Sequence, residues 1–338
     1  MMPGERPLRR LLRPFERAFG CADTTEVVVN RPGEFGVEAG GVWSWHDEPS
    51  LTFDTLDQIA ILAASLSGRD IDGRHPICEG TLPDGQRIHI CRPSATKPGI
   101  LSLTMRKPST KVRTIDDDDF ETMFNSVGAP RSRRAEVDAQ LIAMKRQKDW
   151  RGLFRTAVRQ RKTIAVTGAT GSGKTTLLKT LMLEVPEHER IITVEDADEF
   201  GEMRQRNRVA LMHTSGGQSL AKLSADDCVR SALRMRPDRI GIQEVRGADA
   251  FAFIRALAAG HPGSVTSWHS EEDNFFDALE LMLRQHPSGN SIPADKMRRY
   301  LEQYIDIVVW CARGEDGFSA PFVWLKAEQN PAMLAAAE

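Results

Sequence analysis

One segment constrains the fold of this 338-residue chain more than any other. Residues 168–175 read Gly-Ala-Thr-Gly-Ser-Gly-Lys-Thr, which fits the pattern G-x-x-x-x-G-K-[ST] at every fixed position. An apolar strand over Thr163–Thr167 leads into the segment, and an amphipathic helix over Thr175–Leu183 leads out of it. Glycines let backbone amides converge on phosphate oxygens, and the helix N-terminus adds a positive dipole. The sequence therefore predicts a phosphate-binding loop for a nucleoside triphosphate.

Each position of this loop has an expected role with ATP and Mg²⁺ as ligands. Lys174 reaches the β- and γ-phosphates, and the Thr175 hydroxyl binds the metal. The residues expected to surround the phosphates are Gly168, Ala169, Thr170, Gly171, Ser172, Gly173, Lys174, Thr175 and Thr176.

The second half of the chain alternates short apolar strands with helices. The expected strands are Thr163–Thr167, Arg190–Val194, Val209–His213, Arg239–Gln243 and Ser264–Trp268. The expected helices are Thr175–Leu183, Ala225–Met235 and Ala248–Ala259. This alternation predicts an α/β fold with a mainly parallel, covered sheet.

The first half has short runs of alternating apolar and polar residues, a pattern that predicts a smaller, antiparallel α+β domain. Its alternating runs are Glu26–Asn30, Glu34–Glu38, Val42–Trp45, Arg87–Cys91 and Ile100–Met105, with a helix over Thr55–Leu66. Arg131–Asp149 is polar with few apolar positions and is interpreted as a helical linker. The expected organisation is an N-terminal domain over 1–130, a linker over 131–149 and a C-terminal domain over 150–338.

An amphipathic segment opens the chain. Leu8, Leu11, Leu12, Phe15 and Phe19 share one helical face that Pro14 interrupts, and five arginines lie within the first 17 residues. One interpretation is a helix that rests on anionic lipid. The other, which we favour, is a helix that packs on its own domain.

Composition excludes several classes of protein. The 45 basic and 47 acidic residues give a formal net charge of −2, so direct DNA binding is not indicated. No apolar run is long enough to cross a membrane. The five cysteines contain no C-x-x-C pair, which argues against a disulfide framework or a zinc ribbon and favours a reducing, cytosolic compartment.

Polar side chains follow three of the predicted strands at their carboxyl ends, where open α/β sheets bind ligands. Glu195-Asp196 follow one strand, Gln243-Glu244 end another, and His269 ends a third, with His261 just before that strand. Glu244 could polarise a water molecule in line with the γ-phosphate. Many NTPases carry Asp-Glu at this strand end, and here Gln243 stands in the Asp position.

These segments together resemble the secretion ATPases of the type II and type IV secretion and pilus superfamily. The resemblance rests on the phosphate loop, an acidic box over 191–196, a variant Walker B over 237–246 and a histidine box over 260–269. The run 244–247, Glu-Val-Arg-Gly, is most like the hexameric traffic ATPases of type IV secretion. The N-terminal runs 25–34 and 104–109 also match that family's first domain.

The resemblance implies a RecA-like ATPase domain and gives roles to individual residues. Glu195 and Asp196 would help to hold Mg²⁺ and water, and Glu244 would be the catalytic carboxylate. His269 would orient the γ-phosphate, and Gln243 would contact Mg²⁺-bound water or phosphate. Arg106 is the expected phosphate-contacting cation from the N-terminal domain, with Arg131, Arg133 and Arg134 as competitors.

The family also implies an assembly and a place in the cell. We expect a homo-hexamer with ATP between its two domains, at the cytoplasmic face of the bacterial inner membrane. Its expected partners are inner-membrane channel proteins and coupling ATPases of a secretion or conjugation system. A pilus retraction ATPase, a P-loop kinase and a nucleotide-gated scaffold with little turnover remain alternatives. The absence of a four-cysteine cluster argues against a type II secretion ATPase.

Overall fold

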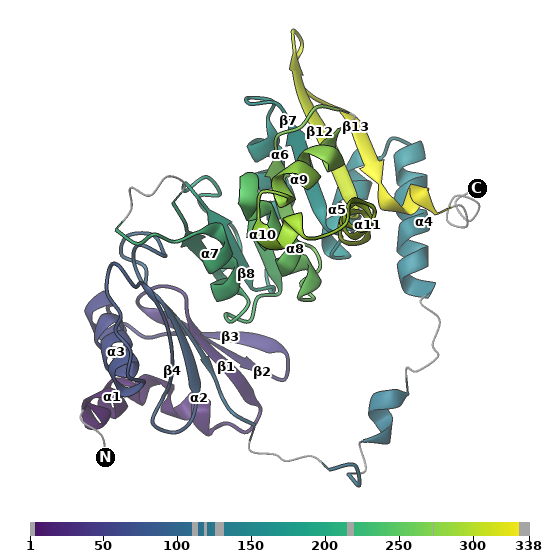
Figure 1. Ribbon diagram of the computed structural model, residues 1–338. Coiled ribbons are helices and arrows are strands. Elements are labelled where there is room, and N and C mark those ends of the chain that lie inside the picture. The colour runs from purple at the N-terminus through teal and green to yellow at the C-terminus, as the bar shows by residue number, and fades with distance from the viewer. Residues whose placement is uncertain are drawn as a thin grey trace.

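The chain folds into two units, each built on its own sheet, as the computed structural model shows (Figure 1). The structure describes residues 4–109, 114–117, 120–125, 132–214, 220–272 and 274–330. The N-terminal unit is purple to blue in Figure 1, and the C-terminal unit runs from teal to yellow. The expectation of a smaller α+β domain ahead of a RecA-like α/β domain is confirmed.

The N-terminal unit is a six-stranded antiparallel sheet in the order β3-β2-β1-β6-β5-β4, with helices packed on it. Its strands are β1 Thr24–Val29, β2 Glu34–Ala39, β3 Val42–Asp47, β4 Ile77–Thr81, β5 Arg87–Cys91 and β6 Ser102–Arg106. Its helices are α1 Glu5–Leu11, α2 Glu16–Gly20 and α3 Phe53–Leu66, with a 3-10 turn η1 at Arg13–Phe15. The Thr52 hydroxyl caps α3 by accepting from the Thr55 amide.

The amphipathic segment at the start of the chain packs on its own unit. Leu8, Leu12 and Phe15 lie in the same apolar cluster as α3 and the sheet. Pro14 falls in the 3-10 turn between α1 and α2, so it breaks the helix as expected. Burial of this apolar face supports the favoured interpretation, a helix that packs on its own domain.

The C-terminal unit is a seven-stranded sheet in the order β13-β12-β7-β11-β10-β8-β9. Neighbouring strands from β12 to β9 are parallel, and β13 is an antiparallel edge strand. The strands are β7 Ile164–Gly168, β8 Ile191–Glu195, β9 Arg208–Met212, β10 Arg239–Ile242, β11 Val265–Trp268, β12 Ile307–Gly314 and β13 Gly317–Leu325. The prediction of a mainly parallel sheet is confirmed, although the sequence reading assigned no strand after Trp268.

Helices cover both faces of this sheet. They are α4 Ser132–Arg146, α5 Trp150–Arg159, α6 Lys174–Leu183, α7 Ala225–Ala232, α8 Ala250–Ala258, α9 Phe275–Leu283, α10 Pro287–Asn290 and α11 Ala294–Tyr304. Short 3-10 turns lie at η3 Gly247–Asp249 and η4 Lys326–Gln329 in this unit. A further turn, η2 Glu121–Phe124, lies along the chain between β6 and α4. α4 spans the predicted linker, and its Val137 and Leu141 are buried with Leu153 of α5. The domain limits proposed from the sequence stay a prediction.

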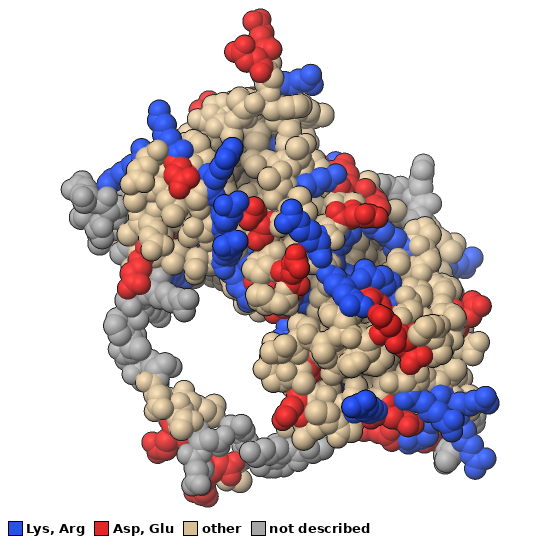
Figure 2. Space-filling model, turned by 180° about the vertical axis from the view of Figure 1, so that it is seen from behind, with Lys and Arg blue, Asp and Glu red and all other residues tan. Residues whose placement is uncertain are grey.

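Charges of both signs are interleaved on the face shown in Figure 2, and neither sign covers a whole unit there. Ion pairs also join the two units. Arg206 donates to Glu34 at 2.8 Å and lies over the Trp45 ring, and Arg234 pairs with Glu79 at 2.8 Å. The loop after β5 also reaches β9, where the Met212 amide donates to the Ala95 carbonyl at 2.9 Å.

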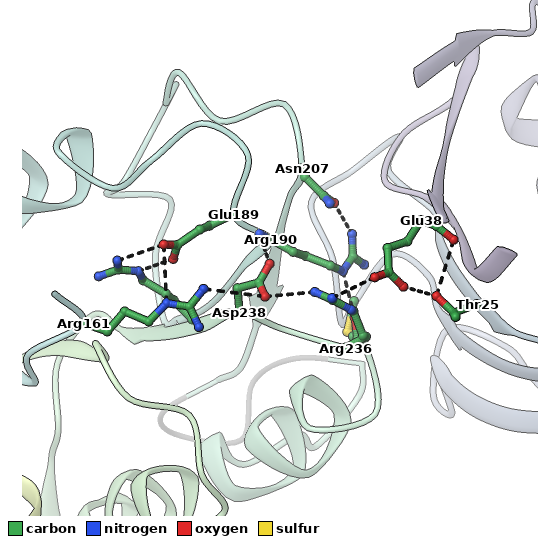
Figure 3. Close-up of polar contacts among 10 residues, drawn as sticks. Thr25, Glu38, Arg161, Glu189, Arg190, Asn207, Arg236 and Asp238 are labelled. Carbon is green, nitrogen blue, oxygen red and sulfur yellow. Dashed lines mark hydrogen bonds and ion pairs between the residues drawn. The ribbon is translucent and has the colours of Figure 1, made fainter. Parts of the chain in front are cut away.

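A chain of ion pairs continues this interface into the C-terminal unit (Figure 3). Arg236 pairs with Glu38 of β2 at 3.2 Å and with Asp238 at 2.9 Å. Asp238 in turn accepts from the Arg190 amide at 2.7 Å. Arg190 is fully buried, and its guanidinium donates to the Asn30 side chain at 2.7 Å and to the Met235 carbonyl at 2.7 Å. A buried arginine is tolerated only when its donors are satisfied, so these contacts fix the two units together.

A buried histidine lies at the same interface. His89 Nε2 is 2.6 Å from the Ser231 hydroxyl of α7, and the Cys91 thiol is 3.2 Å from that hydroxyl. Burial, together with the nearby Arg234 charge, lowers the pKa of His89 to about 4. The imidazole is therefore neutral in the folded protein at neutral pH.

The five cysteines, all within the described residues, are free thiols. No helix among the described residues is both long and apolar enough to span a bilayer.

His89 makes stability depend on pH. The unfolded chain takes up a proton on this side chain below its ordinary pKa of 6.5, whereas the folded protein does so only near 4. Stability should therefore fall as the pH drops through this window, by up to about 3 kcal/mol. Glutamine does not titrate, so the melting temperature of His89→Gln should fall less between pH 7.5 and pH 5 than that of wild type.

Equal losses in both proteins would contradict this assignment. Glu26 opposes the effect, because burial raises its pKa to about 7. It is present in both proteins, so the comparison removes its contribution.

Candidate active site

The phosphate loop leaves β7 at Gly168 and enters α6 at Lys174. Gly168, Gly171 and Gly173 have φ values of +138°, +74° and +90°. These values lie in the region that side chains with a Cβ rarely adopt. A Cβ on Gly168 would also lie 2.1 Å from the carbonyl oxygen of Cys311 on β12. Glycine is therefore required both by backbone conformation and by the close approach of the neighbouring strand.

Lys174 is buried inside its own loop. Its Nζ donates to the carbonyl oxygens of Gly168 at 3.0 Å and Ala169 at 2.8 Å, and lies 3.3 Å from His269 Nδ1. Burial lowers the pKa of the ammonium, and the nearby Glu244 carboxylate opposes that shift. The Ser172 hydroxyl is buried and has no hydrogen-bond partner among the described residues. The loop thus holds polar groups that phosphate oxygens can satisfy.

Polar side chains at the ends of the neighbouring strands form a continuous chain of contacts with Lys174. His269 Nε2 is 3.0 Å from Glu244 Oε1. Arg246 binds both oxygens of Glu244, from Nε and Nη2, at 2.9 Å each. Its Nη1 donates to Asp196 at 2.9 Å. The structure therefore joins Lys174, His269, Glu244 and Asp196 through consecutive contacts.

The charges in this chain perturb one another. Burial alone would raise the pKa of Glu244, but the hydrogen bonds and charge of Arg246 bring it below its ordinary value. Glu244 raises the pKa of Arg246 in return. Glu244 is therefore ionised at neutral pH and able to accept a hydrogen bond from water.

Gln243 supports the site through the backbone. Its Oε1 accepts from the amides of Asp196 at 3.1 Å and Ala197 at 3.4 Å, while its own carbonyl accepts from the Ser267 hydroxyl at 2.8 Å. The side chain thereby holds the end of β8 beside β10. Because this oxygen already accepts from two amides, a direct bond from it to Mg²⁺ is disfavoured, and the expected contact of Gln243 with Mg²⁺-bound water or phosphate stays a prediction.

Glu195 is turned away from the loop. It is fully buried and accepts from the Thr193 hydroxyl at 2.6 Å and the Phe200 amide at 3.4 Å. Burial raises its pKa. Glu195 makes no contact with the phosphate loop among the described residues, and its role in holding Mg²⁺ and water stays a prediction.

Arg106 also lies apart from the loop. Its nearest carboxylate is Glu26, at 3.6 Å, and its side chain is 72 % exposed. It lines a cavity of about 820 Å³ with Arg87, Arg234 and Arg236. No contact of Arg106 with the phosphate loop is found among the described residues.

Two further sequence candidates, His261 and Arg134, also lie away from the loop. His261 precedes β11 and so lies at the opposite edge of the sheet from His269. Arg134 pairs with Asp306 at 3.4 Å, whereas Arg131 lies outside the described residues and the side chain of Arg133 is not described.

Arg246 is the residue that the sequence reading missed as a member of the site. It lies in the run 244–247 that carries the family resemblance, where the motif alone assigns it no role. A cation two residues after a strand-end carboxylate is a usable signal, because the chain can turn back and pair the two.

The fit of Mg²⁺ can be judged from the donor set. Mg²⁺ keeps several waters and uses one or two protein oxygens besides phosphate. Thr175 follows Lys174 in α6 and is partly exposed, so its hydroxyl fits this role. Asp196 follows β8 at the same edge of the sheet and is joined to Glu244 through Arg246, so its carboxylate can enter the water shell of the ion. No cluster of three or more His, Cys, Asp or Glu suited to a metal occurs in the described part of the chain.

Comparison with known proteins decides the family. The sequence model described as "Type II/IV secretion system protein" matches residues 54–284. The chain belongs to this family. It is 37 % identical to the type IV secretion system protein VirB11 of Brucella suis over 306 residues, covering 90 % of this chain and 85 % of the relative. It is 38 % identical to PtlH of Bordetella pertussis over 289 residues, covering 85 % of each chain.

A solved structure of this secretion family has the same fold. The crystal structure of the VirB11 ATPase from the Brucella suis type IV secretion system, in complex with sulphate, superimposes with a TM-score of 0.88. The two chains share 34 % identity, and the match covers 98 % of each. The resemblance stated from the sequence motifs is therefore confirmed.

The Arg246–Glu244 contact predicts a change in pH dependence. Arg246→Gln removes the charge that lowers the pKa of Glu244, so that pKa should rise. If ATP hydrolysis requires ionised Glu244, the acid limb of the profile of kcat/KM against pH should move to higher pH. Arg230→Gln, which removes an exposed arginine of α7, is the control and should leave the limb in place. An unchanged limb in Arg246→Gln would contradict the coupling.

Proposed function

We propose that this protein is an ATP-hydrolysing ring motor that powers assembly of, or transport through, a bacterial type IV secretion system. One observation carries the proposal: the chain of contacts from Lys174 through His269 and Glu244 to Arg246 and Asp196. A plain nucleotide-binding loop needs no strand-end carboxylate, whereas hydrolysis needs a group that orients water. The names of the relatives favour secretion over the pilus retraction alternative.

The chain's own residues have distinct tasks in this proposal. The amides of residues 168–176 and the Lys174 ammonium bind the phosphates, after Lys174 exchanges the Gly168 and Ala169 carbonyls for phosphate oxygens. Glu244 accepts a hydrogen bond from the attacking water, and His269 bridges Glu244 and Lys174. Mg²⁺, held by Thr175 with Asp196 in its water shell, would neutralise charge on the phosphates.

Arg106 remains a proposed phosphate contact from the N-terminal domain. In this chain its exposed guanidinium faces a cavity away from Lys174. It can reach ATP only if the domains move or if it serves the site of a neighbouring subunit. An arginine supplied across subunits would couple hydrolysis to the ring.

The assembly and its location are part of the same proposal. We infer a homo-hexamer at the cytoplasmic face of the inner membrane, in contact with channel proteins and coupling ATPases. Arg6, Arg10, Arg13 and Arg17 are exposed on the N-terminal segment whose apolar face is buried. Any contact with anionic lipid would therefore be electrostatic and superficial.

Phosphate release tests the catalytic assignment. Glu244→Gln should lower the rate by about 10²- to 10⁴-fold while retaining ATP binding, because the amide cannot act as a base. Lys174→Ala should lose both hydrolysis and tight ATP binding. Glu271→Gln, an exposed neighbour of the histidine box, should stay within about twofold of wild type, as surface changes usually do. Wild-type rates in Glu244→Gln would refute the role of Glu244, and negligible turnover in wild type would favour the scaffold alternative.

Native mass measurement tests the ring. With ATP and Mg²⁺, a particle of six subunits should appear. A monomer under all conditions, with and without nucleotide, would rule out the hexamer.

A further inference from the structure

The hairpin β12–β13 continues past the phosphate loop. β12 pairs with β7 up to Cys311 opposite Gly168, and the hairpin then runs on to its turn at Glu315 and Asp316. In Figure 1 it is the yellow projection at the top of the molecule, and in Figure 2 acidic side chains mark its tip. The hairpin therefore lies beside the phosphate loop and extends beyond it.

Phe318 is the hairpin residue that touches the loop. A Cβ built on Gly173 would lie 3.1 Å from Cδ1 of Phe318, so the ring rests against the loop backbone just before Lys174. Phe318 is nevertheless 66 % exposed, more than any other aromatic side chain in the described part of the chain. An aromatic ring held against a binding loop yet left open to solvent has a free surface for a ligand.

Arg313 lies beside this ring. It is the cross-strand neighbour of Phe318, and its guanidinium carbon is 5.2 Å from the ring centroid. Arg313 is itself exposed at the surface of the hairpin. Aromatic rings and guanidinium planes are the side-chain groups on which nucleic-acid bases stack.

We propose that Phe318, assisted by Arg313, is the base-binding part of the nucleotide site. The proposal rests on the proposed function, since it requires the triphosphate to occupy the phosphate loop. A single ribose joins the base to its phosphates, so the side chain on which the base stacks must lie next to the phosphate loop. Phe318 meets that requirement because it contacts Gly173. The stacked base takes the place of solvent on the exposed ring.

Binding measurements with and without a base test this assignment. ATP and inorganic tripolyphosphate should each be titrated calorimetrically into the full-length protein with Mg²⁺. Phe318→Ala should weaken ATP binding by about tenfold or more, as expected for the loss of one base–aromatic stack. Tripolyphosphate binding should be unchanged, because it has no base. Phe318→Trp should restore ATP affinity, and Arg313→Ala should weaken ATP binding selectively but less.

Tyr300→Ala removes an exposed aromatic side chain from α11 and is the matched control, with no expected effect on either ligand. Equal weakening of ATP and tripolyphosphate in Phe318→Ala would overturn the proposal, because the ring would then only support the loop. Unchanged ATP binding would also overturn it. If wild type bound neither ligand, or if Lys174→Ala bound both as wild type does, the proposed function itself would fail.

Discussion

The account depends on a chain of polar contacts across the carboxyl edge of the parallel sheet. Lys174, His269, Glu244, Arg246 and Asp196 follow β7, β11, β10 and β8, which are consecutive in the sheet. Parallel strands place these ends at one edge, so residues up to 95 positions apart in sequence can touch. Each charge has a partner before any ligand arrives. Binding therefore exchanges partners and leaves no buried charge unsatisfied.

The residues that flank β8 contact both the N-terminal unit and the phosphate site. Arg190, just before its first residue, bonds to Asn30 of the N-terminal unit, while Asp196, just after its last, bonds to Arg246. Beyond Asp196, Asp198 pairs with Lys97 of the N-terminal unit. A short, fully buried strand thus connects the interface between the units to the phosphate site. A shift of the N-terminal unit would therefore act on Asp196 through β8.

Much of the fold was predictable because its signals are local. The phosphate loop, the strands that flank it and the antiparallel character of the first unit follow from period and turn residues. β4 was missed because Ile77–Thr81 contains Gly80 and lacks strict alternation. Strand order is a tertiary property, so the sequence could not show that Glu195 would end three strands from β7 and face Thr193. Nor could it show that Arg106 would lie apart from the loop or that Phe318 would reach Gly173.

A crystal structure with Mg²⁺ and a slowly hydrolysed ATP analogue tests the central claim most directly. The account predicts that Lys174 leaves the carbonyls of Gly168 and Ala169 for phosphate oxygens, with Glu244 facing the γ-phosphate and still held by Arg246. A structure in which Lys174 keeps its carbonyl partners, or in which Glu244 points away from the γ-phosphate, would contradict it.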